Sequence, residues 1–110
     1  MKEIKALIRP GMLEAVLRAL HEHPDLPGVT VSEVHGYGRV AGQAPSGTTG
    51  YGTIKMAKLE CIVDDDRAPE VIALIREHAH TGSPGDGKIA THAIESLVRI
   101  RTGESVRNAE

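Results

Sequence analysis

The residues best placed to do chemistry lie in the segment Thr81–Lys88, whose sequence is TGSPGDGK. Its three glycines and one proline exclude a regular helix and permit backbone angles that a side chain would forbid. A loop of this kind can turn several backbone N–H groups toward one point, which suits an anion. Lys88 adds a mobile positive charge, and Arg99 and Arg101 follow on a segment that we expect to be a strand. Together these groups predict a site for a polyphosphate chain.

A simpler reading of the same loop is a turn, because Gly, Pro and Asp are the ordinary residues of turns. The loop is not the P-loop of nucleotide hydrolases. Gly82, Gly87 and Lys88 have the required spacing, but Ile89 stands where that motif needs a Ser or Thr for magnesium. The sequence also contains no convincing nucleophile–base pair or carboxylate dyad. It therefore predicts a binding protein and not an enzyme.

The composition narrows the class of protein. A chain of 110 residues has the size of one domain, so we expect a single domain over residues 1–110. The net charge of −2 and the near absence of aromatic residues argue against a nucleic-acid partner. The core must be aliphatic, and a small aliphatic core favours burial between subunits. One cysteine, Cys61, and no apolar signal or membrane-spanning run predict a soluble, cytoplasmic protein.

Hydrophobic periodicity predicts the elements that position these groups. We expect strands over residues 2–9, 29–34, 54–63 and 88–94, and helices over residues 12–20 and 68–79. Asp66 is expected to cap the second helix. The order β-α-β-β-α-β predicts the α+β class and the ferredoxin-like fold, in which a four-stranded antiparallel sheet carries both helices on one face.

A long segment without an apolar face separates the second and third strands. Residues 40–53 carry four glycines, Pro45 and several Ser and Thr. We expect a long mobile loop over about residues 37–54, of the kind that is functional or disordered in a compact domain. The polar residues 103–110 are expected to form a flexible tail.

Four segments in order make the chain resemble the PII family of nitrogen-regulatory signalling proteins over almost its whole length. They are KEIKALIRP at 2–10, GVTVSEVHGYGR at 28–39, TGSPGDGKI at 81–89 and VRIRTGE at 98–104. The resemblance implies a homotrimer with ATP, ADP or AMP in clefts between subunits, as effector ligands and not as obligatory cofactors. It also implies that the long loop, the family's T-loop, docks on a regulated transporter or metabolic enzyme, which would allow peripheral contact with a membrane protein.

The resemblance implies roles for individual residues as well. The glycine-rich loop and its lysine hold phosphates, and two arginines of the adjacent subunit complete the cradle. A threonine of the second strand meets the adenine, and residues at the root of the long loop lie near the phosphates. The nucleotide-binding residues expected on this basis are Thr30, Gly36, Gly38, Arg39, Gly85, Asp86, Gly87, Lys88, Arg99 and Arg101.

The long loop departs from the family pattern. Val40 stands where a typical member has a glutamine that helps to bind magnesium and 2-oxoglutarate, and valine has no side-chain oxygen to offer a cation. We therefore do not expect 2-oxoglutarate sensing, although magnesium can still accompany a nucleotide. Tyr51 is a candidate for the modification that some members carry on a loop tyrosine, but its neighbours Gly50 and Gly52 do not match theirs.

The chain also has six histidines, which raise a second hypothesis: a metal-responsive trimer whose nucleotide cleft is vestigial. His21 and His23 lie two residues apart near a helix end, as do His78 and His80. Such pairs do not share one helical face, so we assign no metal ligands. The sequence leaves open the identity of the partner, the preferred nucleotide and any second effector.

Overall fold

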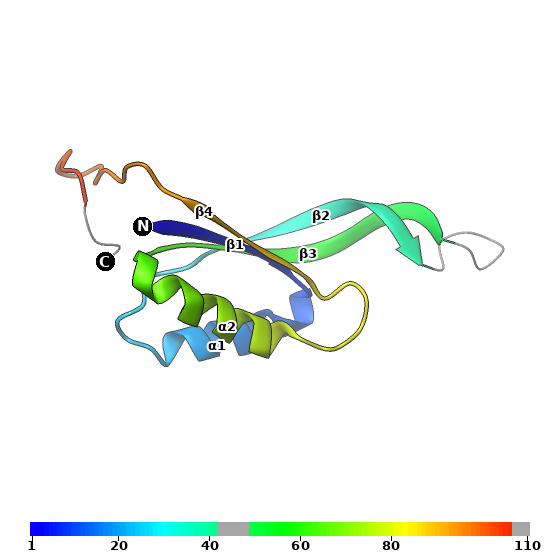
Figure 1. Ribbon diagram of the computed structural model, residues 1–110. Helices are drawn as coiled ribbons and strands as arrows, with labels where there is room; N and C mark the ends of the chain where they lie inside the picture. The colour runs from blue at the N-terminus through cyan, green and yellow to red at the C-terminus, as the bar shows by residue number, and fades with distance from the viewer. Residues whose placement is uncertain (42–48, 107–110) are drawn as a thin grey trace.

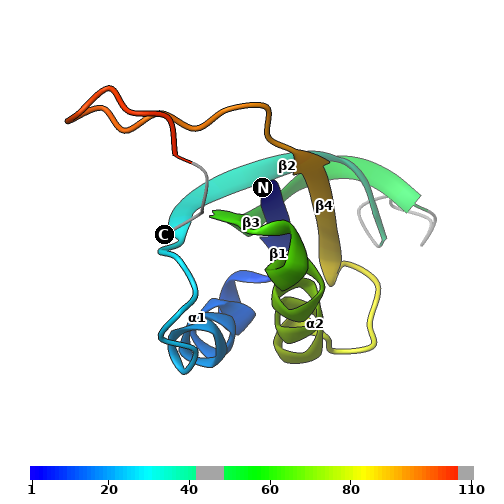
Figure 2. The ribbon, with the colours of Figure 1, turned by 60° about the vertical axis from the view of Figure 1, so that its left-hand side comes forward.

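A computed structural model describes residues 1–41 and 49–106 (Figure 1). In chain order the elements are β1 (Lys2–Ile8), a 3-10 turn (Pro10–Met12), α1 (Leu13–His21), β2 (Thr30–Ala41), β3 (Thr49–Val63), a second 3-10 turn (Asp65–Arg67), α2 (Ala68–Ala79) and β4 (Gly87–Ala93). The strands form one sheet in the order β2-β3-β1-β4, with every neighbouring pair antiparallel. Both helices cover the same face (Figure 2). The predicted ferredoxin-like fold is confirmed.

The core lies between the sheet and the two helices. Alternation along β1 directs Ile4, Ala6 and Ile8 to the helical face, where each is at most 2% exposed. The same alternation along β3 buries Leu59 and Val63, and the helices add further aliphatic side chains. Burying one such side chain contributes roughly 1.5–3 kcal/mol. The fold is therefore held by aliphatic packing, as a chain without Phe or Trp requires.

The expected long loop is corrected, because much of it is strand. β2 and β3 pair as far as Ala41 opposite Thr49, and the two strands extend well past the ends of β1 and β4 (Figure 1). Pairing across the hairpin satisfies the backbone N–H and C=O groups that the two strands turn toward each other, whatever the side chains are, which outweighs the low strand propensity of glycine. The remainder of the expected loop, residues 42–48, lies outside the described residues.

The segment that carries the two arginines is a turn and not the expected strand. Val98 bridges Ser105, the Arg99 N–H donates to the Glu104 carbonyl at 3.0 Å, and the Gly103 N–H donates back to the Arg99 carbonyl at 2.8 Å. The chain can reverse here because Gly103 adopts a positive φ of 72°. Residues 103–106 of the expected tail thus belong to this turn, and residues 107–110 lie outside the described part of the chain.

Asp66 does not cap α2, contrary to the prediction. Asp65 and Asp66 belong to the 3-10 turn, Arg67 occupies the N-cap position, and no side chain caps the helix there. Asp65 instead forms an ion pair with the N-terminal amine, whose nitrogen lies 3.0 Å from Asp65 Oδ1. This contact lowers the pKa of the Asp65 carboxyl group. No helix in residues 1–41 and 49–106 is long and apolar enough to cross a bilayer.

We expect Ile75→Ala to destabilise the protein by about 2–5 kcal/mol, because this α2 side chain is 1% exposed and its removal leaves a cavity in the core. Glu77→Ala, on the exposed side of the same helix, is the control and should change the free energy of unfolding by about 0.5 kcal/mol or less. Chemical denaturation measures both. Equal effects of the two substitutions would contradict the placement of the core.

Candidate phosphate-binding site

The glycine-rich loop joins the end of α2 to the start of β4. It must reverse the chain within residues 80–86 so that β4 can run beside β1. All three of its glycines adopt a positive φ, which is +89° at Gly82. Gly85 has a φ of +97°, and Gly87 has a φ of +102°, which favours glycine over any residue with a Cβ. A Cβ on Gly87 would also lie 1.7 Å from the Leu7 carbonyl oxygen. The start of β4 can therefore approach β1 this closely only because residue 87 is a glycine.

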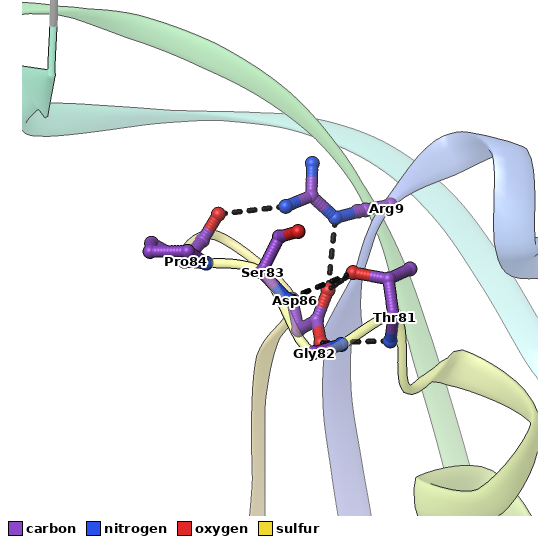
Figure 3. Close-up of polar contacts among 6 residues, drawn as sticks. All are labelled: Arg9, Thr81, Gly82, Ser83, Pro84 and Asp86. Carbon is purple, nitrogen blue, oxygen red and sulfur yellow. Dashed lines mark hydrogen bonds and ion pairs between the residues drawn. The ribbon is translucent and has the colours of Figure 1, made fainter.

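The Asp86 carboxylate is the centre of the loop (Figure 3). Its Oδ2 accepts hydrogen bonds from the backbone N–H groups of Thr81 at 2.8 Å and Gly82 at 2.9 Å. Its Oδ1 accepts from the Thr81 hydroxyl and from Arg9 Nε, the latter at 3.0 Å. Arg9 Nη2 donates in addition to the Pro84 carbonyl oxygen at 2.6 Å. One carboxylate thus closes the loop on itself and ties it to the end of β1.

These contacts fix the charge state of Asp86. The hydrogen bond from the Thr81 hydroxyl, followed by those from the Thr81 N–H and from Arg9, holds the pKa of Asp86 well below its ordinary value. Asp86 is therefore ionised at neutral pH, and its charge faces donors within the protein. The structure places it as the anchor of the loop, whereas the expected contact with phosphate remains a prediction.

Lys88 follows at the exposed edge of the sheet, where it pairs with Leu7 of β1. Beside it, between α2 and β4, lies a pocket of about 360 Å³. The pocket is lined by the aliphatic residues Ile8, Ile72, Ile75, Ala79 and Ile89, together with Arg76, His80, Asp86, Gly87 and Lys88. Aliphatic walls next to cationic side chains suit a ligand that has both an apolar and an anionic part.

The expected residues of β2 lie far from this loop within one chain. Thr30, Gly36 and Gly38 are on β2, at the edge of the sheet opposite β4, with β3 and β1 between. Three strand spacings put the two edges about 14 Å apart. Arg39 and Tyr51 pair with each other in the β2–β3 hairpin, but their side chains are not described.

The expected arginines lie at the other end of β4. Lys88 is at the start of this seven-residue strand, whereas Arg99 and Arg101 are in the exposed turn beyond its last residue (Figure 1). Since a strand rises about 3.3 Å per residue, the length of β4 alone separates them by about 20 Å. One chain does not bring the glycine-rich loop, the arginines and Thr30 together.

Arg9 and Thr81 take part in the loop, and the sequence had not assigned either of them a site role. Thr81 belonged to the segment already singled out. Arg9 could have been found from the predicted topology, because β1 and β4 run antiparallel and the residue after β1 must meet the residues before β4. That signal is a consequence of sheet register and not of any local motif.

Three of the six histidines contact an acidic side chain or a backbone carbonyl group. His23 Nδ1 lies 3.4 Å from Glu70 Oε1, and His92 Nε2 lies 3.0 Å from Glu3 Oε1. His78 Nδ1 contacts the Leu74 carbonyl oxygen at 2.9 Å. Within the part of the chain that the structure describes, no three His, Cys, Asp or Glu side chains are grouped so as to hold a metal ion.

The comparison with known proteins bears on the whole chain. The sequence model of the family described as "Nitrogen regulatory protein P-II" matches residues 1–104. The chain belongs to the P-II family. A "Nitrogen regulatory protein P-II 2" of Methanothermobacter thermautotrophicus is 43% identical over 112 residues, covering 99% of this chain and 96% of that protein. The P-II protein of Bradyrhizobium diazoefficiens is 42% identical over 108 residues, with 96% of each chain covered, and that of Azospirillum brasilense is 39% identical over 107 residues, with 94% and 95% covered. The resemblance found from the four sequence segments is thus confirmed.

We expect Gly87→Ala to destabilise this P-II chain by about 3 kcal/mol or more, because the added Cβ would collide with the β1 backbone. Gly28→Ala is the matched control, since Gly28 has no atom within 4 Å of an added Cβ and no positive φ. It should change stability by about 1 kcal/mol or less. Thermal and chemical denaturation compare the two, and a Gly87→Ala protein as stable as Gly28→Ala would show that the approach of β4 to β1 is looser than described.

The low pKa of Asp86 predicts a pH-dependent contribution to stability. The carboxyl pKa is lower in the folded than in the unfolded protein, so the contribution is fully present above the unfolded value and is lost in acid. The difference in free energy of unfolding between the wild type and Asp86→Asn should be constant above about pH 5 and shrink below about pH 4. Denaturation of both proteins from about pH 7 down to about pH 3 measures this difference. A difference that stays constant, or that widens in acid, would contradict the assigned contacts.

Proposed function

We propose that this P-II protein is a regulatory protein that binds ATP, ADP or AMP in the clefts between the subunits of a homotrimer and signals the bound state to a partner protein. Lys88 and the glycine-rich loop of one subunit hold the phosphates, and Arg99 and Arg101 of the next subunit close the site. Thr30 meets the adenine. Magnesium can accompany the nucleotide.

The observation that carries the proposal is the placement of the two cationic groups at opposite ends of β4. An ordered glycine-rich loop that ends in Lys88 and an exposed pair of arginines occur in one chain, yet they are too far apart to serve one ligand. A second copy can supply the missing half. Membership of the P-II family, together with the aliphatic residues of the sheet face that the helices leave uncovered, supports such an assembly.

The chemistry of the two halves is complementary. A lysine offers a compact charge that follows the phosphate, whereas an arginine offers a planar fork that binds phosphate oxygens in pairs. Charge-assisted hydrogen bonds contribute about 1.5–3 kcal/mol each. A few of them suffice for micromolar affinity, about −8 kcal/mol, after the costs of association.

The β2–β3 hairpin is the proposed route of the signal. It carries Gly36 and Gly38 near its root, so a ligand bound there can change the surface that the hairpin presents to a partner. The proposed partner is a regulated transporter or a metabolic enzyme. Sensing of 2-oxoglutarate is not part of the proposal, because Val40 has no side-chain oxygen.

Calorimetry with ATP, ADP and AMP on the purified protein tests the proposal. We expect Lys88→Ala and Arg101→Ala each to weaken nucleotide binding by about tenfold to a hundredfold, because each removes charge-assisted contacts. Arg18→Ala is the control: it also removes an exposed arginine, but one on α1 whose partner is Glu14. Its affinity should equal that of the wild type.

Two results would contradict the proposed function. One is the absence of binding at near-millimolar nucleotide. The other is a protein that sediments as a single subunit under the conditions of the titration, because the two halves of the site could then not meet.

A further inference from the structure

The contact between Arg9 and Asp86 joins residues that are 77 positions apart in the sequence. Arg9 lies just after β1, and Asp86 is the last loop residue before β4 (Figure 3). The Arg9 side chain is 36% exposed and that of Asp86 is 23% exposed, so the pair is partly withdrawn from solvent. An ion pair in this position is worth more than one on an open surface, because water screens it less.

This pair controls the shape of the loop. Asp86 collects the Thr81 hydroxyl and the N–H groups of Thr81 and Gly82, and Arg9 fixes that carboxylate relative to the sheet. The same guanidinium also holds the Pro84 carbonyl oxygen. It passes so close to Gly85 that a Cβ there would lie 3.2 Å from Arg9 Nη2. Arg9 thus contacts the loop directly at Pro84 and Asp86 and reaches Thr81 and Gly82 through the Asp86 carboxylate.

The pair also controls the charge of the loop. Asp86 lies two residues before Lys88, next to the place proposed for phosphate. A carboxylate whose charge was not compensated would repel an anionic ligand there and would counteract the charge of Lys88. Arg9 supplies the compensating charge from the side of the sheet.

We propose that Arg9 is a positioning residue of the phosphate site: it holds the glycine-rich loop in its anion-binding shape through Asp86 and cancels the charge of that carboxylate. In this role Arg9 acts through Asp86 and not by contact with the ligand. The inference rests on the proposed function, since it concerns the same site.

A double-mutant cycle tests the charge argument. ATP affinity is measured by calorimetry for the wild type, Arg9→Met, Asp86→Asn and the double variant. Arg9→Met should bind about tenfold or more weakly, since it frees an uncompensated carboxylate and releases the loop. The double variant should bind about threefold or more tightly than Arg9→Met, because the repelling charge is gone. If Arg9 did not compensate Asp86, Asp86→Asn would change the ATP affinity by the same factor in the wild type and in Arg9→Met.

Amide hydrogen exchange without nucleotide tests the effect on the loop. The N–H groups of Thr81 and Gly82, which donate to Asp86, should exchange faster in Arg9→Met than in the wild type. Arg9→Lys keeps the positive charge but loses the planar guanidinium, so the protection of these two amides should lie between that in the wild type and that in Arg9→Met. Arg9→Lys also replaces Arg9→Met in this test if Arg9→Met does not fold. Arg18→Met, which removes the guanidinium paired with Glu14, should leave these two amides unchanged.

The outcomes separate this inference from the proposed function. Wild-type protection of the Thr81 and Gly82 amides in Arg9→Met, or a double variant that binds ATP no better than Arg9→Met, overturns the inference while nucleotide binding by the wild type stands. A wild type that binds no nucleotide overturns the proposed function, and with it the affinity part of the inference. Faster exchange in Arg9→Met together with a rescued double variant supports the positioning role.

Discussion

β4 pairs with β1 over its full length, from Ala93 opposite Lys2 to Gly87 opposite Ile8. This pairing determines where each part of the candidate site lies. It brings the glycine-rich loop against the end of β1, where only a glycine at position 87 lets the two backbones meet. It also places Arg9 beside Asp86, and it directs the turn with the arginines away from the loop. A shift of the register by one residue would change all of these placements together.

The strand order places the residues expected to contact the ligand at opposite edges of the sheet. β4, which carries Lys88, is one edge, and β2, which carries Thr30, is the other. A site that needs residues from both edges cannot be completed by folding one chain, but it can be completed where the edges of two chains meet. Such an arrangement makes binding depend on assembly. Within the single chain, Asp86 and Arg9 already organise the glycine-rich loop.

The sequence predicted most of the fold because its local signals agree with the tertiary arrangement. The second helix was predicted over its observed bounds, Ala68–Ala79, since its apolar stripe, early proline and flanking loop all indicate the same ends. The hairpin beyond residue 36 could not be predicted in this way. Its glycines leave no alternation of apolar and polar side chains, and its backbone pairing does not depend on them. The turn around Gly103 was missed for the reverse reason: Val98, Ile100 and the arginines alternate like a strand, but no neighbouring strand in the described chain pairs with them over that length.

The least predictable part of the site is the role of its one acidic residue. In the sequence Asp86 stands within a loop that otherwise reads as a phosphate binder, and the family resemblance assigned it to the ligand. A carboxylate is a poor neighbour for phosphate unless its charge is used elsewhere. In the structure it is used by Thr81, Gly82 and Arg9, and the last of these comes from the other end of the chain. The positively charged partner of Asp86 comes from a long-range contact, and a motif that covers the loop alone does not contain that contact. The Asp86 carboxylate thus shapes the loop but adds a negative charge there, and Arg9, which follows β1, compensates that charge.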